Sequence, residues 1–447
     1  MTVDSVLYNT KVFFKGKLVD AGIAIDEGKI VKIAKVPNLP KASERIDLNG
    51  NITLPGLIDI HVHLRDQKLA YKETFHTGTA AAAAGGMTTV IDMPNNNPVT
   101  MDSLALKQRM KLAEKNLFVN VGFNSAFPAD LSEIPKIVEA GAVGFKVYLA
   151  NGLGGINVDD DQSLLKYFKK VSEYKIPILI HAEDRLTIES KKISLQKGKN
   201  FDLMSYVKSH SSEAEARSIK RIISLVKNFN IAVHFCHLSS ELGLKEILLA
   251  KKAKLPVTCE VTPHNLFLSS EKYNVFKTLG LTDPPLRKNK DVKSLWRAVT
   301  HGLIDIIASD HAPHTLNEKR AKSVWDVSPG IPGLETTLSL LLDQTNKGEF
   351  SIQKLVQLMA ENPAKMFSLG YRGFLLEKNR ADLVVVDLKK EHVIDSNSFL
   401  SKSKYSPFDK MKLKGKAIKT IVNGVLVMDE GQIMSVPPPG NILNKSS

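Results

Sequence analysis

The stretch DIHVHLRD, residues 59–66, carries a polar side chain at every second position. These positions are Asp59, His61, His63 and Arg65. Aliphatic residues fill the positions between them. Successive side chains of a β-strand point to opposite faces, so the four polar groups would share one face. The pattern predicts a strand whose polar face meets a polar partner elsewhere in the fold.

Between residues 54 and 370, short apolar runs alternate with helical segments, which is typical of βα units and a parallel sheet. Eight runs read as buried strands: GLIDIHVH, TTVIDMP, FVNVGFN, AVGFKVYL, IPILIHAE, IAVHFCH, LPVTCEVT and IDIIASD. Helical patterns such as DQSLLKYFKKVSEY lie between them. Eight units predict an α/β fold of the (β/α)8 TIM-barrel type, whose active site lies at the C-terminal ends of the strands.

Both ends of the chain are rich in short β-like runs. VLYNTKVFF and AGIAI lie near the start, and ADLVVVDL and AIKTIVNGVLVM lie near the end. Two strand-rich ends that flank a long middle predict one small β-sandwich domain formed by both termini. The expected division is 1–53 and 371–447 for the β-sandwich and 54–370 for the barrel.

The composition excludes several classes of protein. The formal net charge is +14, but the lysines are scattered and no basic block with interleaved aromatics indicates nucleic-acid binding. No apolar run approaches the roughly 20 residues of a membrane-spanning helix. Cys236 and Cys259 lie inside apolar runs, which favours buried reduced thiols. Because the N-terminus lacks the features of a signal peptide, we expect a cytoplasmic protein.

Metal-competent or titratable residues recur at or near the ends of the predicted strands. They are His61, His63, Lys146, His181, His237 and Asp310. The C-terminal ends of barrel strands meet at one mouth, so these side chains are expected to converge. Neutral imidazoles and carboxylates suit zinc and similar divalent ions. The pattern predicts a metal-dependent catalytic site.

Each of these residues has a structural alternative. A single histidine at a strand end, such as His181, is often a hydrogen-bonded structural residue. Asp310 is placed to cap a following helix, and Lys146 could extend along an outer face to solvent. The recurrence at corresponding ends of successive strands favours the metal site.

Eight segments together resemble the dihydroorotases, which belong to the amidohydrolase superfamily. They are GLIDIHVHLRD, GTAAAAAGGMTTVIDMPNNNP, FKVYL, ILIHAED, HFCHLSS, TCEVTPHNLFLS, ASDHAPHT and GIPGLETTL. The resemblance spans nearly the whole chain. It implies that His61, His63 and Asp310 hold one zinc ion and that His181 and His237 hold a second.

Lys146 matches a lysine that in several dihydroorotases reacts with carbon dioxide and bridges both ions as a carbamate. An ammonium would repel two dications, whereas a carbamate supplies anionic oxygens. Some dihydroorotases bridge the ions with an aspartate instead, and Asp159, Asp160 and Asp161 offer that alternative. These aspartates precede a helical pattern as N-cap and first-turn acids, so the bridge is assigned to Lys146.

The resemblance also implies a reaction. A hydroxide that bridges the ions attacks the cyclic amide, and Asp310 shuttles the proton as general acid and base. In the biosynthetic direction N-carbamoyl-L-aspartate closes to L-dihydroorotate. Related hydantoinases, dihydropyrimidinases and allantoinases share nearly the same ligands, so the metal residues alone do not choose the substrate.

Arg65 is the residue that discriminates among these substrates, because its guanidinium offers a bidentate partner to the carboxylate of dihydroorotate. Asn95 and His314 match the family's other carboxylate-binding positions. The structural alternatives are a salt bridge from Arg65 to Asp59 or Asp66 and a turn role for Asn95.

Two departures from the family pattern stand out. HLRDQKLAYKETF replaces the usual HLRDPG start, and Asp283 in LTDPPLR stands where many members have Asn, which adds a negative charge near a dianionic substrate. Cys236 and Glu260 are expected beside the metal face as supporting or core residues. An inactive barrel that partners aspartate transcarbamoylase is the non-enzymatic alternative, and a homo-oligomer is also considered.

Overall fold

A computed structural model describes residues 2–199, 201–434 and 437–444. Its centre is a barrel of eight parallel strands in the order β13-β12-β11-β10-β9-β8-β7-β6. The strands are β6 (Leu57–Val62), β7 (Met87–Asp92), β8 (Asn120–Ala126), β9 (Gly144–Tyr148), β10 (Ile178–His181), β11 (Val233–Phe235), β12 (Val257–Val261) and β13 (Ile306–Ile307). Each coincides with a predicted run, so the TIM-barrel prediction is confirmed.

The first barrel strand, β6, and the segment after the last one, β13, meet through a short contact. Val62 forms a parallel β-bridge with His311, and the His63 amide donates to the His311 carbonyl at 2.9 Å. This contact joins β6 to the segment after β13. The barrel therefore closes at its C-terminal mouth, directly beside the DIHVHLRD stretch.

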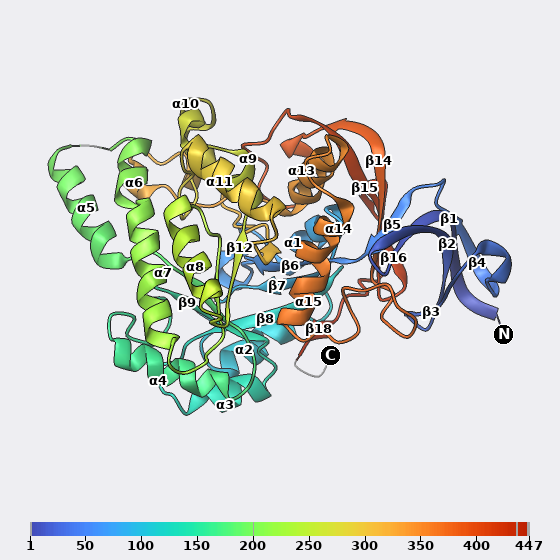
Figure 1. Cartoon of the computed structure of the whole chain (residues 1–447), viewed down its shortest axis with the longest axis horizontal. Helices are drawn as coiled ribbons and strands as arrows, with labels where there is room; N and C mark the ends of the chain where they lie inside the picture. Colours follow the sequence, from blue (N-terminus) through green and yellow to red (C-terminus); the bar gives the residue numbers. More distant parts are fainter. Residues whose placement is uncertain (1, 200, 435–436, 445–447) are drawn as a thin grey trace.

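Helices follow the strands and surround the barrel (Figure 1). They are α1 (Phe75–Ala84), α2 (Ser103–Ala113), α3 (Glu133–Glu139), α4 (Asp161–Ser172), α5 (Arg185–Lys197), α6 (Leu203–Ser209), α7 (Ser212–Val226), α8 (Glu241–Lys252), α9 (Pro263–Phe267), α10 (Tyr273–Phe276), α11 (Asn289–Thr300), α12 (Leu316–Lys319), α13 (Leu334–Asn346), α14 (Ile352–Val356) and α15 (Asn362–Met366). Side-chain N-caps begin many of them. Thr74 caps α1, Asp160 caps α4 and Ser240 caps α8, each by accepting from a backbone amide of the first turn.

A second sheet, of nine strands, joins the two ends of the chain at one side of the barrel (Figure 1). Its strands are β1 (Thr2–Phe14), β2 (Lys17–Asp26), β3 (Lys29–Ala34), β4 (Lys41–Asp47), β5 (Ile52–Pro55), β14 (Leu383–Val393), β15 (Lys412–Val422), β16 (Val425–Asp429) and β17 (Gln432–Ile433). The N-terminal β5 pairs antiparallel with the C-terminal β14. A short β18 (Ile442–Leu443) pairs with β8 of the barrel. The predicted β-rich unit from both termini is confirmed, and its boundaries stay a prediction.

Strand β14 shows why this sheet holds to the barrel. Leu383 and Val385 belong to the hydrophobic core of the terminal sheet, whereas Val384 and Val386 belong to the core shared with the barrel. Successive side chains of a strand point to opposite faces, so the VVV run is buried on both sides. One strand thereby links the two hydrophobic cores.

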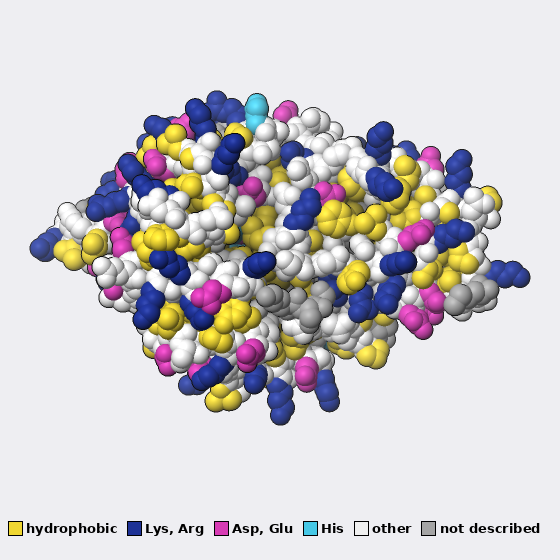
Figure 2. Space-filling view, turned by 60° about the horizontal axis from the view of Figure 1, so that its bottom comes forward, with side chains coloured by type: hydrophobic (Ala, Val, Ile, Leu, Met, Phe, Trp, Pro, Cys, Tyr) yellow, Lys and Arg dark blue, Asp and Glu magenta, His cyan; other side chains and the backbone are white. Residues whose placement is uncertain are grey.

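The distribution of charges on the surface agrees with the scattered lysines of the sequence. Lys and Arg side chains are scattered among acidic ones over the face in Figure 2, with no single basic patch. Cys236 and Cys259 are free and buried, as predicted. Within the described ranges, no helix has both the length and the apolar character needed to cross a membrane.

Candidate metal centre

The alternating polar residues of DIHVHLRD are all buried along and just after strand β6, whose pairing with β7 is irregular between Asp59 and Val62. Asp59 is fully buried and accepts backbone hydrogen bonds from Ser309 and His61, each at 3.1 Å. Burial raises the pKa of Asp59 to about 7, against the lowering effect of these bonds. Asp59 therefore has a structural role, because its hydrogen bonds connect β6 to the segment that follows β13.

His61, His63 and Asp310 form the first candidate ligand group. Asp310 Oδ1 lies 3.3 Å from His61 Nε2 and 3.2 Å from His63 Nε2. All three side chains are buried. Burial lowers the pKa of His63 to about 3, so its imidazole is neutral and keeps a lone pair for a cation.

His181 and His237 form the second group, at the ends of β10 and β11. His181 Nδ1 lies 3.0 Å from His237 Nε2. The His237 ring also lies next to His61, with ring centroids 5.3 Å apart, so the two groups adjoin. Burial and the nearby His181 hold the pKa of His237 well below its usual value. The structure thus brings these five side chains together in one cluster, and their role as metal ligands stays a prediction.

Three of the four histidines are held by an outer acceptor. Glu260 contacts His61 Nδ1, Asn95 Oδ1 lies 2.5 Å from His63 Nδ1, and Glu183 Oε2 lies 3.2 Å from His181 Nε2. An acceptor on one ring nitrogen keeps the hydrogen there and leaves the other nitrogen free to bind a metal. The remaining nitrogens are those that face the centre of the cluster.

The sequence analysis missed one of these acceptors, Glu183. The signal was present in HAED, because Glu183 follows His181 by two positions at the end of a strand. Asn95, predicted as a substrate contact, lies against His63, and its substrate role stays a prediction. Glu260 has the expected supporting position, since it also accepts from His234 Nε2 at 3.1 Å and from the His237 amide.

Lys146 is fully buried beside this cluster, which excludes the alternative of a surface lysine. Its ammonium donates to Cys236 Sγ at 2.9 Å and lies 5.0 Å from the Tyr148 ring centroid. Burial raises the pKa of Cys236 to about 12, so the thiol is neutral. Within the described ranges, no carboxylate lies at ion-pair distance from Lys146. The lysine thus has a position in which an unmodified positive charge is uncompensated.

Arg65 is also buried without an acidic partner among the residues that the structure describes. Its Nη2 lies 3.3 Å from His314 Nε2, and its Nε has no hydrogen-bond partner within the described part of the chain. Asp66 instead accepts from the amides of Gln67 and Phe75, while Asp59 bonds to the backbone. The alternative of a salt bridge from Arg65 to either aspartate is therefore wrong.

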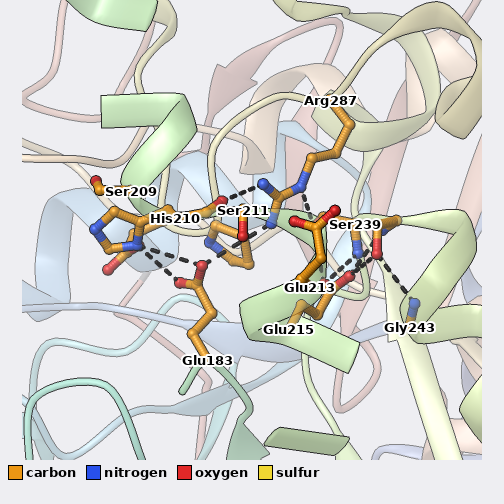
Figure 3. Close-up of polar contacts among 12 residues, drawn as sticks. Glu183, Ser209, His210, Ser211, Glu213, Glu215, Ser239, Gly243 and Arg287 are labelled. Carbon is orange, nitrogen blue, oxygen red and sulfur yellow. Dashed lines mark hydrogen bonds and ion pairs between the residues drawn. The ribbon is translucent and has the colours of Figure 1, made fainter. Parts of the chain in front are cut away.

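A buried polar network supports the His181 side of the cluster. Figure 3 shows Glu183 pointing toward the ring of His210, with Arg287 beside them. His210 Nδ1 lies 3.2 Å from Glu183 Oε2 and 3.0 Å from Asp283 Oδ1. Burial lowers the pKa of His210, but these two carboxylates outweigh it and raise the pKa to about 10. Asp283 therefore shares the positive charge of protonated His210 with Glu183.

This pair leads to a prediction for stability. Because the folded-state pKa of His210, about 10, exceeds the unfolded value of about 6.5, its pairing stabilises the fold fully below the lower value and is lost as pH rises through the upper one. We expect His210→Gln to lower the free energy of unfolding, with a deficit that shrinks toward pH 10. Urea unfolding across this range measures it.

The exposed His301, which follows the last residue of α11, provides the matched control. His301→Gln is expected to change the unfolding free energy little and without this pH trend. A constant deficit for His210→Gln between neutral pH and pH 10 would contradict the ion-pair explanation.

Comparison with known proteins agrees with this geometry. The model of the amidohydrolase family matches residues 52–427. A dihydroorotase from Methanothermobacter thermautotrophicus is 38% identical over 92% of this chain and 92% of that protein. A dihydroorotase from Pyrococcus horikoshii is 36% identical over 100% of this chain and 97% of its own length. The chain therefore belongs to the amidohydrolase family, and these relatives within the family are dihydroorotases.

Solved structures with the same fold include hydantoinases. An L-hydantoinase (dihydropyrimidinase) from Arthrobacter aurescens has a TM-score of 0.95 at 30% identity and covers 99% of this chain and 100% of its own. A D-hydantoinase has a TM-score of 0.91 at 26% identity, covering 99% and 98%. The protein is therefore a hydrolase of the amidohydrolase family, and its barrel has the same fold as the barrels of these structures.

The donor set fits divalent metal ions. Four imidazoles and one carboxylate converge, and outer acceptors aim three of the imidazoles inward. Nitrogen and carboxylate ligands of this kind suit zinc and similar ions. The family and this geometry together define a metal-dependent hydrolase.

Proposed function

We propose that this enzyme is a dihydroorotase, which interconverts N-carbamoyl-L-aspartate and L-dihydroorotate in pyrimidine biosynthesis. The observation that carries the proposal is the buried Arg65, which lacks an acidic partner among the described residues and follows the ligand His63 by two positions. A buried guanidinium is costly unless an anion pairs with it. L-Dihydroorotate has a carboxylate to supply that anion, whereas dihydrouracil has none.

We assign two zinc ions to the cluster. His61, His63 and Asp310 would hold one ion, and His181 and His237 would hold the other. When bound, such ions lower the pKa of a water molecule and polarise a carbonyl group. Support comes from the lowered pKa values of His63 and His237, which keep these two imidazoles neutral.

We assign the bridge between the ions to Lys146 in its carboxylated form. Reaction with carbon dioxide replaces an ammonium by an anionic carbamate, which suits a position between two cations. Support comes from the complete burial of Lys146 and from the absence of an acidic partner among the described residues.

Asp310 moves the proton in this mechanism. Burial raises its pKa, but the imidazoles of His61 and His63 outweigh that effect and hold the pKa well below its usual value, so the carboxylate is ionised. During cyclisation it accepts a proton from the carbamoyl nitrogen that attacks the side-chain carboxyl carbon. The C–N bond forms, a C–O bond breaks, and the oxygen leaves as water with that proton and one from solvent. Ring opening reverses these steps.

Arg65 holds the substrate during these steps. Its donors would bind the carboxylate that remains outside the reacting centre and orient the ring toward Asp310, and His314, the second predicted carboxylate-binding residue, lies beside them at 3.3 Å from Arg65 Nη2. Burial of both side chains excludes water, which strengthens the contact.

A hydantoinase, dihydropyrimidinase or allantoinase is the second candidate, favoured by the TM-score of 0.95 with an L-hydantoinase structure. Assays with L-dihydroorotate, dihydrouracil, hydantoin and allantoin side by side distinguish them. We expect kcat/KM for L-dihydroorotate to exceed the others by about 100-fold or more, since Arg65 is left unpaired by a substrate without a carboxylate. A preference for any neutral ring would overturn the proposal. Turnover of none would favour the inactive scaffold.

The guanidinium geometry of Arg65 is itself testable. Arg65→Lys keeps the positive charge but loses the bidentate contact, so KM for both N-carbamoyl-L-aspartate and L-dihydroorotate is expected to rise roughly 10- to 100-fold with a much smaller change in kcat. Steady-state kinetics in both directions measure this. The exposed Arg320 is the control, and Arg320→Lys should leave KM unchanged. An unchanged KM in Arg65→Lys would argue against a bidentate contact.

We place the enzyme in the cytoplasm, and support for this comes from its two buried, free cysteines. Association with aspartate transcarbamoylase or with further copies of the chain stays a prediction, as does the division at residues 53 and 370. Size-exclusion chromatography with light scattering measures the oligomeric state directly.

A further inference from the structure

His314 lies between two cationic side chains at the mouth of the barrel. Its Nδ1 is 3.1 Å from Lys72 Nζ, and its Nε2 is 3.3 Å from Arg65 Nη2 and 3.0 Å from the Pro329 carbonyl. Lys72 precedes α1 and also pairs with Glu318 of α12 at 2.7 Å. Lys72, like Arg65 and His314, is buried. The sequence analysis gave Lys72 no role.

The hydrogen on the His314 ring can be located from these contacts. Burial, together with Arg65 and Lys72, holds the pKa of His314 well below its usual value, so the ring is neutral and carries one N–H. An ammonium only donates, so Nδ1 beside Lys72 must accept. Nε2 therefore carries the hydrogen and donates it to the Pro329 carbonyl. The opposite tautomer would point N–H at the ammonium and lose the bond to Pro329.

This tautomer has a consequence for Arg65. A protonated Nε2 has no lone pair, so His314 cannot accept from Arg65 Nη2 across the 3.3 Å between them. Both Nη2 and the unpartnered Nε of Arg65 then stay available as donors for an anion. A carboxylate takes two parallel N–H donors of a guanidinium in a bidentate contact.

We propose that Lys72 is a positioning residue that holds His314 in the Nε2–H tautomer and so keeps the Arg65 donors free for the substrate carboxylate. Without the Lys72 ammonium, Glu318 loses its cationic partner and becomes an anionic acceptor 3.9 Å from Nδ1, so the ring hydrogen can move to Nδ1 in exchange for the weaker bond to the neutral Pro329 carbonyl. Nε2 would then accept from Arg65, and the substrate carboxylate would have to displace that bond. The role of the carboxylate rests on the proposed function, whereas the tautomer does not.

The test uses the full-length, metal-loaded enzyme with Lys72→Met, which keeps the side-chain length and removes the donor. We expect KM for L-dihydroorotate and N-carbamoyl-L-aspartate to rise about 10-fold, with kcat changed much less, because one competing hydrogen bond is added to the free site. Lys72→Arg restores a cationic donor and should recover most of the wild-type KM. Glu318→Gln breaks the ion pair with Lys72 but leaves its contact with His314, so its KM should stay near wild type.

Nitrogen NMR of enzyme with isotope-labelled histidine reads the tautomer directly, with the His314 signals assigned by their loss in His314→Gln. The wild type should carry the hydrogen on Nε2 and Lys72→Met on Nδ1. An Nε2–H ring in Lys72→Met, or an unchanged KM in that variant, would overturn the inference. A loss of activity equal in Lys72→Met and Glu318→Gln would also overturn it, because it would assign Lys72 to the support of α12. If the wild type turns over neither substrate, the proposed function fails, and the NMR result still decides the tautomer.

Discussion

Asp310→Asn is expected to lower kcat in both directions by about 1000-fold, the scale of a lost general acid and base, while much of the bound metal remains. An amide cannot accept the proton of the attacking nitrogen. It can still offer an oxygen to the ion held by His61 and His63, whose inner nitrogens lie within 3.3 Å of Asp310 Oδ1. Kinetics together with metal analysis of the same preparation separate the two effects.

Asp305 provides the control, since it lies at the opposite end of β13 and pairs with Lys251 at 2.6 Å, away from the cluster. Asp305→Asn is expected to retain the wild-type kcat. If Asp310→Asn turned over substrate at a similar rate to this control, another group would be the base. A variant that lost both metal and activity would instead assign Asp310 mainly to coordination.

Lys146→Ala has the second large expected effect. It removes the proposed carbamate, so activity should fall by about 100-fold or more and one of the two metal ions should be lost. Short carboxylic acids such as acetate or propionate fit the space left by the side chain and should restore part of the activity, because they supply the anionic oxygens that such ions prefer. Intact mass measurement under gentle conditions should show one added carbon dioxide in the wild type only.

The aspartate alternative provides the matched controls for this experiment. Asp160 caps α4 by accepting from the Gln162 amide, and Asp159 pairs with Arg185. Both carboxylates therefore have structural partners outside the cluster, whereas Lys146 has no carboxylate partner among the described residues. Asp159→Ala and Asp160→Ala should keep activity and both ions. Full activity in Lys146→Ala with loss in either aspartate variant would move the bridge to the aspartates.

Residues 59–66 show which features of the site could be predicted from the local sequence pattern. Alternation along a strand is a property of the backbone itself, so the sequence alone predicted that His61 and His63 share a face, and the structure brings both rings to Asp310. The aliphatic residues do not share one opposite face, because Ile60 lies in a different core from Val62 and Leu64. The same argument located the strand ends, and with them His181, His237 and Asp310, because parallel strands of a barrel end at one mouth. The candidate ligands could thus be predicted without any knowledge of their partners.

The partners themselves were decided only by the tertiary structure. His61 meets Glu260 from 199 positions away, and Arg65 meets His314 from 249 positions away. Closure of the barrel and the register of its strands bring these segments together, and no periodicity within one strand records that distant arrangement. The alternation within residues 59–66 predicted that Arg65 lies on the same face as the candidate ligands His61 and His63. Only the fold decided that Arg65 has no acidic partner among the described residues and that Lys72 lies 3.1 Å from its neighbour His314.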